Sequence, residues 1–218
     1  MKAPQHQSRS IACVSSRLAR HYSLPKAIID IMGSSVLILV LSPLFIIIGG
    51  LVLVTSGGPI IYRRRVVGPA GEFDAYKFRT MRPDADRMLE QDARLRHAFH
   101  SNFKLRRDPR VTRTGAVLRK FSLDELPQLF NVLHGQMSLV GPRMITAEEL
   151  TKYGEYKELL LTVKPGLTGY WQVHGRQQVS YSERVRMDIE YIQSWSLRTD
   201  IQLLLMTPWQ VLRGKGAY

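Results

Sequence analysis

The sequence predicts an α/β, mostly helical chain: a broken, re-entrant N-terminal membrane helix, a small β-hairpin and interfacial amphipathic helices around a compact cytoplasmic domain. Three observations support this class. An uninterrupted apolar run covers residues 31–54. Two short alternating segments, 60–67 and 72–79, flank a glycine-rich turn. Helices are expected at 83–99, 182–195 and 201–212, and the length of 218 residues suits one domain.

Composition and charge exclude several classes of protein. Hydrophobic residues make up 44% of the chain, which excludes a wholly disordered basic protein. The single cysteine, Cys13, excludes an internal disulfide framework and a cysteine-rich metal site. The formal net charge is +13, and all of this excess lies in residues 1–122, because residues 123–218 are neutral overall. Such a charge points to nucleic acid or an anionic membrane as the partner.

The apolar run is long enough to enter a membrane. Its 24 residues would reach roughly 36 Å as a helix, compared with about 30 Å for a hydrocarbon core. A cleaved signal peptide is disfavoured, because a long polar segment precedes the run and no small-residue cleavage site follows. We therefore divide the chain into a basic N-terminal segment (1–25), a membrane helix (26–56) and a cytoplasmic domain (57–218).

Two observations bear on the topology of this helix. Both flanks are basic, and the positive-inside rule would place both on the cytoplasmic face. Ser42-Pro43 lies at the middle of the run, where proline removes a helical hydrogen bond and favours a bend. These facts lean slightly toward a hairpin that enters and leaves by one face. A kinked single span remains the alternative, since proline is common in membrane helices.

The next segments predict local structure. A helix is expected from Pro83 to about Phe99, with Asp84 and Asp86 in its first turn. These two aspartates also match the D-x-D pattern by which some glycosyltransferases hold a metal, but so short a pattern is common by chance. We prefer the role in the helix N-terminus. Basic residues then gather in 104–120, as a solvated charge run or as contacts to lipid headgroups or substrate phosphates.

Two further helices are expected near the C-terminus. Residues 182–195 have apolar side chains at helical spacing. Residues 201–212 are more strongly apolar but too short to span a bilayer, which predicts a core helix or one that lies on the membrane surface.

Asp124 and Glu125 are the strongest candidates for chemistry. They directly follow the basic run, in a chain without the common nucleotide-binding, serine-hydrolase or zinc-protease motifs. Ser122 and Glu125 also fit a capping box, although Pro127 suits that register poorly. A helix that begins slightly later would place both carboxylates near its N-terminus. One could then attack phosphorus while the other holds a metal, with arginines neutralising the target.

Two later segments are candidate ligand contacts. Gly141-Pro142 places Arg143 after a rigid turn. Residues 164–176 predict a glycine-rich loop without helix or strand periodicity, either an ordinary surface loop or a nucleotide or sugar contact. Its candidate contact residues are Trp171, Gln172, Gly175 and Arg176.

Taken together, these segments resemble the bacterial sugar transferase family, the monotopic phosphoglycosyl transferases that start polysaccharide assembly on polyprenyl phosphate. The resemblance runs from Lys26 to the C-terminal Tyr218. One departure is Met144, where the family often has a second proline. The matching motifs are Lys26-x-x-x-Asp30, Ser42-Pro43, Tyr76-Lys77-Phe78-Arg79-Thr80-Met81, Ser122-Leu123-Asp124-Glu125-Leu126-Pro127-Gln128, Gly141-Pro142-Arg143 and Pro165-Gly166-Leu167-Thr168-Gly169.

The resemblance implies a mechanism. Asp124 would attack the β-phosphorus of a UDP-sugar and release UMP, and polyprenyl phosphate (undecaprenyl phosphate) would then take the sugar phosphate from the aspartate. Mg²⁺ would be bound by Glu125 together with Asp124. Arg119 and Arg143 would bind phosphates, and Asp200 matches a carboxylate near the family's site.

The resemblance also implies location and partners. In the family, Ser-Pro breaks a re-entrant helix, which places a monotopic protein in the bacterial inner membrane with its catalytic domain on the cytoplasmic face. The partners would be UDP-sugar, polyprenyl phosphate and membrane lipid, with no nucleic acid and with a homo-oligomer left open. The short C-terminal ending suggests the exopolysaccharide-initiating branch, with galactose or glucose as the sugar. The alternatives are a non-catalytic basic adaptor at the membrane and a D-x-D glycosyltransferase that releases UDP.

Overall fold

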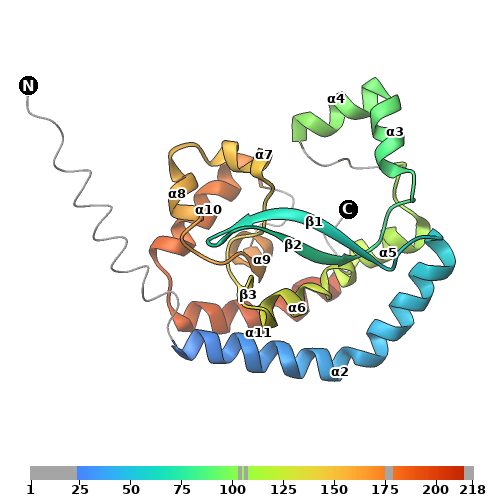
Figure 1. The fold of residues 1–218 in the computed structure, drawn as a ribbon. Helices are drawn as coiled ribbons and strands as arrows, with labels where there is room; N and C mark the ends of the chain where they lie inside the picture. Colours follow the sequence, from blue (N-terminus) through green and yellow to red (C-terminus); the bar gives the residue numbers. More distant parts are fainter. Residues whose placement is uncertain (1–23, 103–104, 106–107, 175–178, 214–218) are drawn as a thin grey trace, which may run out of the picture.

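The computed structural model describes residues 24–102, 105, 108–174 and 179–213, and the chain follows the order shown in Figure 1. A long helix, α2 (Leu24–Ser56), leads into an antiparallel hairpin of β1 (Ile61–Gly68) and β2 (Gly71–Phe78). The remaining elements are α3 (Ala85–Gln91), α4 (Ala93–Asn102), α5 (Arg113–Lys120), the 3₁₀ turn η1 (Leu123–Glu125), α6 (Gln128–Leu133), β3 (Ser138–Val140), α7 (Ala147–Leu150), η2 (Thr151–Tyr156), α8 (Lys157–Leu160), β4 (Gly166–Thr168), α9 (Tyr170–His174), α10 (Tyr181–Gln193) and α11 (Leu197–Arg213). Helices dominate, as expected.

Helix α2 continues through Pro43 without interruption. Proline has no N–H, so the carbonyl of Leu39 loses its helical partner. The hydroxyl of Ser42 donates to that carbonyl at 2.8 Å and so replaces the missing bond. Figure 1 shows that the helix changes direction along its length. The predicted break is therefore a bend inside one helix, stabilised by the serine that precedes the proline.

The N-terminal end of α2 is tied to the rest of the protein by two buried charged residues. The ammonium of Lys26 contacts Asp200 Oδ2 at 2.6 Å and donates to the carbonyl of Val140 at 3.0 Å. One turn later, Asp30 Oδ1 accepts hydrogen bonds from the hydroxyl of Ser138 and the N–H of Leu139. Burying charged side chains requires such partners, so these contacts fix where the helix begins against β3 and α11.

The C-terminal half of α2 packs against the same body. Phe45 has its ring 5.6 Å from that of Phe78 on β2 and 5.9 Å from that of Phe130 on α6. Ile48 and Val52 are buried in a small cluster with Phe78 and Leu118. By contrast, much of the remaining surface of this helix is apolar and exposed, with Leu39, Ile46 and Val54 all at least 75% exposed.

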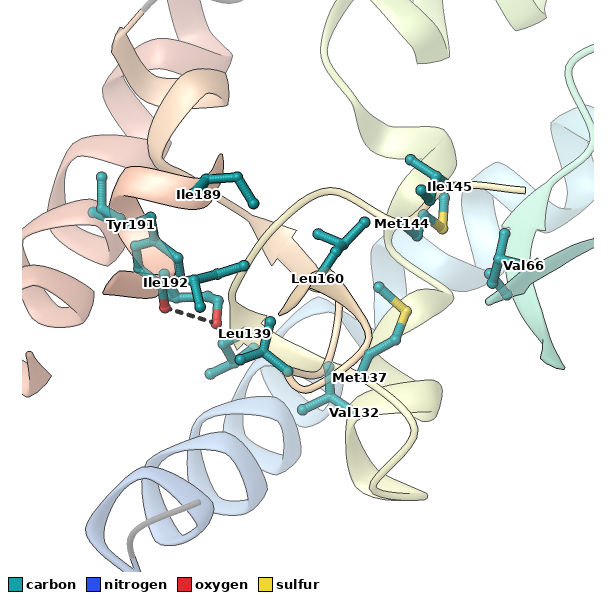
Figure 2. Packing of buried hydrophobic residues seen from close by; sticks show 14 of the residues in the cluster. Val66, Val132, Met137, Leu139, Met144, Ile145, Leu160, Ile189, Tyr191 and Ile192 are labelled. Carbon is teal, nitrogen blue, oxygen red and sulfur yellow. Dashed lines mark hydrogen bonds between the residues drawn. The ribbon is translucent and has the colours of Figure 1, made fainter. Parts of the chain in front are cut away.

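The hairpin confirms the expected strands. Its register runs from Ile61 opposite Phe78 to Gly68 opposite Gly71. Gly71 has φ = 102°, a conformation that favours glycine and closes the turn. The hairpin contributes Val66 to the main hydrophobic core, together with residues from the helical part (Figure 2).

The segment 164–176 differs from the expected irregular loop. Residues 166–168 form β4, which pairs in parallel with β3, and Tyr170–His174 form helix α9. A Cβ atom on Gly166 would lie 2.1 Å from the nitrogen of Gly141, and one on Gly169 would lie 2.3 Å from the oxygen of Gly141. The glycines thus permit backbone to approach backbone. A periodicity test misses this arrangement because a three-residue strand is too short to show one.

The expected helix at 83–99 is two helices. Asp92 ends α3, and its carboxylate accepts hydrogen bonds from the N–H groups of Arg94 and Leu95, which caps the start of α4. Asp84 occupies the N-cap of α3 without a side-chain capping bond, because its carboxylate pairs with Arg82 instead. The predicted continuous helix was therefore wrong at this point.

The two C-terminal helices are present as expected. Helix α10 covers the core with Ile189 and Ile192 (Figure 2). In α11, Leu203 is fully buried while Leu205, Trp209 and Leu212 are exposed. This helix therefore contributes to the core on one side, which confirms a core helix, and exposes apolar side chains on the other; a position on the membrane surface stays a prediction.

Candidate active site

Asp124 and Glu125 lie together in η1, a single 3₁₀ turn between α5 and α6. Ser122 precedes them in the left-handed region, with φ = 54°, and its side chain makes no capping hydrogen bond. Of the two predicted alternatives, the capping box is absent and the later start is found: the helix proper begins only after Pro127, with both carboxylates in the 3₁₀ turn before it. The side chain of Glu125 does not turn back toward the backbone of Ser122, because two cations hold it elsewhere.

Those cations are Lys77 and Arg143. The ammonium of Lys77, on β2, is 2.7 Å from Glu125 Oε1, and the guanidinium of Arg143 contacts both carboxylate oxygens, at 2.5 and 3.2 Å. Burial alone would raise the pKa of Glu125, but Arg143 and Lys77 together hold it well below its usual value. Glu125 is therefore ionised at neutral pH.

Asp124 has different surroundings although it is adjacent in sequence. The residue is buried, 7% exposed, and within the described part of the chain no hydrogen bond or ion pair reaches its carboxylate. Burial raises the pKa of Asp124 above its usual value; Lys77 opposes this shift, and the charge on Glu125 adds to it. This carboxylate is the one left uncommitted, which suits a nucleophile or a metal ligand.

The basic run supplies two arginines to the same region. Arg119, at the end of α5, donates from Nε to the hydroxyl of Thr80 at 2.9 Å. Its guanidinium is largely buried, which lowers its pKa, although the negative charge of Asp124 opposes the effect. Arg110 is held by Asp108 through two short contacts, at 2.7 and 2.8 Å. At these two positions the run is therefore not a solvated charge run.

These residues open onto one large cleft with a volume of about 1920 Å³. Its polar wall includes Arg119, Asp124, Glu125 and Arg143. Its other wall is apolar and comes from the N-terminal half of α2 and from α11: Ile28, Met32, Val36, Leu37, Leu204, Pro208 and Val211. The cleft therefore joins a cationic site with two carboxylates to an apolar surface. An amphiphilic anion would suit such a cleft.

The other candidate contacts have different positions. Gln172 lines the cleft and donates from Nε2 to the carbonyl of Leu167. Gly175 and Arg176 lie outside the described residues. Asp200 does not line the cleft, because its carboxylate binds Lys26, the hydroxyl of Tyr191 at 2.7 Å and the indole of Trp195 at 3.0 Å. In this position Asp200 anchors the start of α2 through Lys26.

Lys77 belongs to the site, although the sequence patterns did not identify it as a candidate. The alternation in β2 places it on the same face as Phe73 and Ala75, which are both buried. A lysine on the buried face of a strand needs an anionic partner, and this pattern could have indicated that Lys77 belongs to a site. Its partner is 48 positions away in the sequence, so no local rule could have named it.

The site offers a limited set of metal ligands. Among the described residues, no cluster of three or more histidine, cysteine, aspartate or glutamate side chains could hold a metal. Asp124 and Glu125 are two adjacent carboxylates, one of them without a partner. Mg²⁺ commonly binds through one or two carboxylates and completes its shell with water and substrate phosphates. The residues present therefore fit Mg²⁺ bound together with a substrate, but not a metal cage built from protein alone.

Comparison with known proteins identifies the family. The family model described as "Bacterial sugar transferase" matches residues 21–214. The chain belongs to the bacterial sugar transferase family. This sugar transferase is 43% identical, over 89% of its length and 88% of the relative's, to the exopolysaccharide production protein ExoY of Rhizobium meliloti.

Two longer relatives carry more specific names. The undecaprenyl-phosphate galactose phosphotransferase of Salmonella typhimurium is 45% identical over 88% of this sugar transferase and 41% of its own length. The UDP-galactose-lipid carrier transferase of Erwinia amylovora is 42% identical over 94% of this chain and 44% of its own length. The matched family region includes the site residues Lys77, Arg119, Asp124, Glu125 and Arg143.

Proposed function

We propose that this sugar transferase moves a hexose 1-phosphate from a UDP-sugar to polyprenyl (undecaprenyl) phosphate and releases UMP, as the first membrane step of exopolysaccharide or related glycoconjugate synthesis. The observation that carries the proposal is the buried pair in which Glu125 is held by two cations while Asp124 is uncommitted. The names of the relatives agree with a sugar-phosphate transfer to a lipid carrier.

In the first step, a carboxylate oxygen of Asp124 attacks the β-phosphorus of the donor. A new aspartyl oxygen–phosphorus bond forms, the bond from this phosphorus to the bridging oxygen breaks, and UMP leaves with that oxygen. A negatively charged nucleophile approaches a negatively charged diphosphate here, so the surrounding cations Lys77, Arg119 and Arg143 lower the barrier. Glu125, held ionised by Lys77 and Arg143, keeps both cations beside the phosphorus.

In the second step, a phosphate oxygen of the polyprenyl phosphate attacks the same phosphorus. The aspartyl–phosphate bond breaks, and the carboxylate of Asp124 is restored. The product is polyprenyl diphosphate-sugar. No proton has to be removed from a phosphate dianion, so the residues of the site need only position the two anions and neutralise their charge.

Mg²⁺ fits this scheme through Asp124 and Glu125 together with the diphosphate. When bound, it supplies charge neutralisation on the donor's phosphate oxygens. The chain's own contribution is then to hold Glu125 in place through Lys77 and Arg143.

The apolar wall of the cleft fits the polyprenyl chain. Helix α2 carries exposed apolar residues along most of its length, and it is the one helix in the described part of the chain that is long and apolar enough to enter a membrane. We propose a re-entrant position for this helix at the inner membrane, with the catalytic domain on the cytoplasmic face. The acceptor's phosphate would then meet Asp124 at the membrane surface.

The test is a reaction of the purified protein with a panel of UDP-sugars. We expect UMP as the nucleotide product, a requirement for Mg²⁺ that EDTA reveals, and a sugar-phosphate adduct on Asp124 by mass spectrometry. Asp124→Asn should lose both the adduct and turnover. Turnover of that variant at the wild-type rate would show that Asp124 is not the nucleophile.

The same assay separates the alternatives. Release of UDP in place of UMP would indicate a D-x-D glycosyltransferase. Absence of any nucleotide product, together with salt-sensitive binding to anionic lipid, would indicate an adaptor without catalytic activity.

A further inference from the structure

A second group of unsatisfied polar side chains lines the cleft, in the wall formed by α9 and α10. Arg184, Trp171 and Gln172 all border the same cleft as Asp124 and Glu125. The Nε and Nη2 groups of Arg184, Nε1 of Trp171 and Oε1 of Gln172 are buried and have no hydrogen-bond partner among the described residues. Leaving a buried polar atom unpaired costs about 1–3 kcal/mol, so a group of them marks a place where a ligand or ordered water completes the bonding.

Neighbouring aromatic rings hold Arg184 in position. Its guanidinium lies 4.8 Å from the ring of Trp171 and 5.2 Å from the ring of Tyr181. The carboxyl group of Asp188 has its Oδ2 4.0 Å from Nε of Arg184, too far for a hydrogen bond. Stacked on aromatic faces, the guanidinium keeps N–H groups at its edge for another partner.

The chemistry of these atoms defines the ligand they suit. Arg184 and Trp171 offer donors, whereas Gln172 offers an acceptor, since its Nε2 already donates to Leu167. A phosphate has only acceptors at neutral pH apart from one weakly acidic proton, so it would leave the oxygen of Gln172 unpaired. A sugar hydroxyl both donates and accepts, and it therefore matches all three side chains.

We propose that Arg184, Trp171 and Gln172 form the subsite for the hexose of the donor and select among hexoses by their hydroxyl groups. The proposal rests on the proposed function. The hexose is bonded directly to the phosphorus that Asp124 attacks, whereas the nucleobase is separated from it by the second phosphate and the ribose. The cleft that Arg184, Trp171 and Gln172 border is also the one that Asp124 lines, so a donor bound there can place its hexose against this wall.

The test compares three variants of the full chain in detergent or lipid nanodiscs: Arg184→Met, Gln172→Met and Arg186→Met. Arg186 is the matched control, because it lies on the same helix with an exposed side chain that pairs with Glu183. For each variant we would measure kcat/KM with UDP-galactose and UDP-glucose and the inhibition constant of UMP. UMP contains the base and one phosphate but no hexose.

We expect Arg184→Met to lower kcat/KM by about tenfold or more, with the inhibition constant of UMP unchanged. Gln172→Met should change the ratio of the two kcat/KM values for the two hexoses, while Arg186→Met should match the wild type. Unchanged UMP inhibition also shows that the variants are folded.

Three results would overturn the subsite. Weaker UMP inhibition in parallel with the loss of donor turnover would mean that these residues bind the nucleotide. An equal loss in Arg186→Met would mean that only the overall charge matters. Wild-type behaviour of both subsite variants would mean that the residues do not contact the donor. If the wild type releases no UMP from any UDP-sugar, the proposed reaction fails, and calorimetric binding of UDP-hexose relative to UMP still decides the subsite.

Discussion

Asp124 and Glu125 occupy one turn of 3₁₀ helix, yet their surroundings shift their pKa values in opposite directions. Burial raises the pKa of Asp124, whereas Arg143 and Lys77 overcome the effect of burial and lower that of Glu125. Two neighbouring carboxylates with opposite shifts commonly have different roles in a mechanism. This division agrees with the proposed mechanism, in which Glu125 is the fixed anion that holds the cations and Asp124 is the nucleophile.

Lys77 should prove to be a positioning residue. In Lys77→Met, Asp124 and Glu125 both lose a cation that lowers their pKa values, so both pKa values should rise, and the acidic limb of the pH–rate profile, set by the carboxylate with the higher pKa, should move to higher pH. We expect a loss of about 100-fold in kcat from the missing charge. Lys77→Arg, which keeps the charge, should recover part of the rate. A rate loss without any movement of the acidic limb would contradict the effect of Lys77 on the pKa values of the two carboxylates.

Asp188 predicts a pH dependence of stability. Burial raises its pKa from 3.8 to about 7, with its Oδ2 bonded to the hydroxyl of Tyr153 at 2.7 Å. The folded protein therefore binds this proton more tightly than the unfolded chain. Stability should be highest below about pH 4 for this group and should fall as pH rises toward 7, by roughly 1.4 kcal/mol per unit of pKa difference.

The variant Asp188→Asn tests this dependence by thermal denaturation between pH 4.5 and 8. The variant cannot ionise at this position, so its stability relative to the wild type should increase with pH. Glu183→Gln is the control, because Glu183 is an exposed carboxylate on the same helix. A difference between Asp188→Asn and the wild type that stays constant with pH would contradict the raised pKa.

At the scale of elements, the parallel pairing of β3 with β4 joins two segments of the site. The backbone of Gly141, just before Arg143, lies against Gly166 and Gly169 with no room for a side chain. Gly166→Ala should therefore destabilise the protein by roughly 2 kcal/mol or more, because its Cβ would meet backbone atoms that cannot move aside.

The matched control is Gly50→Ala, since a Cβ on that glycine meets nothing within 4 Å. Thermal denaturation of both variants in the same detergent gives the comparison. If Gly166→Ala melted with the wild type, the close approach of the two strands would be wrong.

The elements differ in how much of them could be predicted from the sequence. The hairpin, α10 and α11 follow local patterns of side chains, and they were found where those patterns placed them. The capping box, one of the two alternatives at Ser122, is absent because Lys77 and Arg143, both distant in the sequence, hold the side chain of Glu125. Likewise β4 was missed because its glycines are explained only by the backbone of Gly141. Long-range partners, and not propensities, decided each of these cases.

At the scale of the whole molecule, α2 is bound to one body along its length. Lys26 and Asp30 anchor its start to β3 and α11, and Phe45, Ile48 and Val52 pack near its end against β2, α5 and α6. Figure 1 shows α2 running along one side of the molecule and leading into β1. If α2 crossed the bilayer as a straight span, its two ends would lie on opposite faces. Either the polar hairpin after its end or the buried ion pair at its start would then have to pass through the membrane, at a high cost in free energy. A position in one leaflet requires no such transfer.

This arrangement predicts that both ends of α2 face the same side of the membrane. The native cysteine would be removed by Cys13→Ser, and single cysteines introduced by Leu24→Cys or Glu72→Cys, two exposed positions on either side of the helix. In sealed inverted vesicles, a membrane-impermeant maleimide should label both positions before detergent is added, because both would lie on the former cytoplasmic face. Labelling of one position only after detergent would establish a span and overturn the re-entrant position.

The variant Lys26→Met gives a second test. In the one-sided arrangement this variant should be less stable than the wild type, because Asp200 would be buried without its cation. In a spanning protein the attachments at Lys26 and Phe45 would have to break in the membrane, so the same variant would leave the stability unchanged.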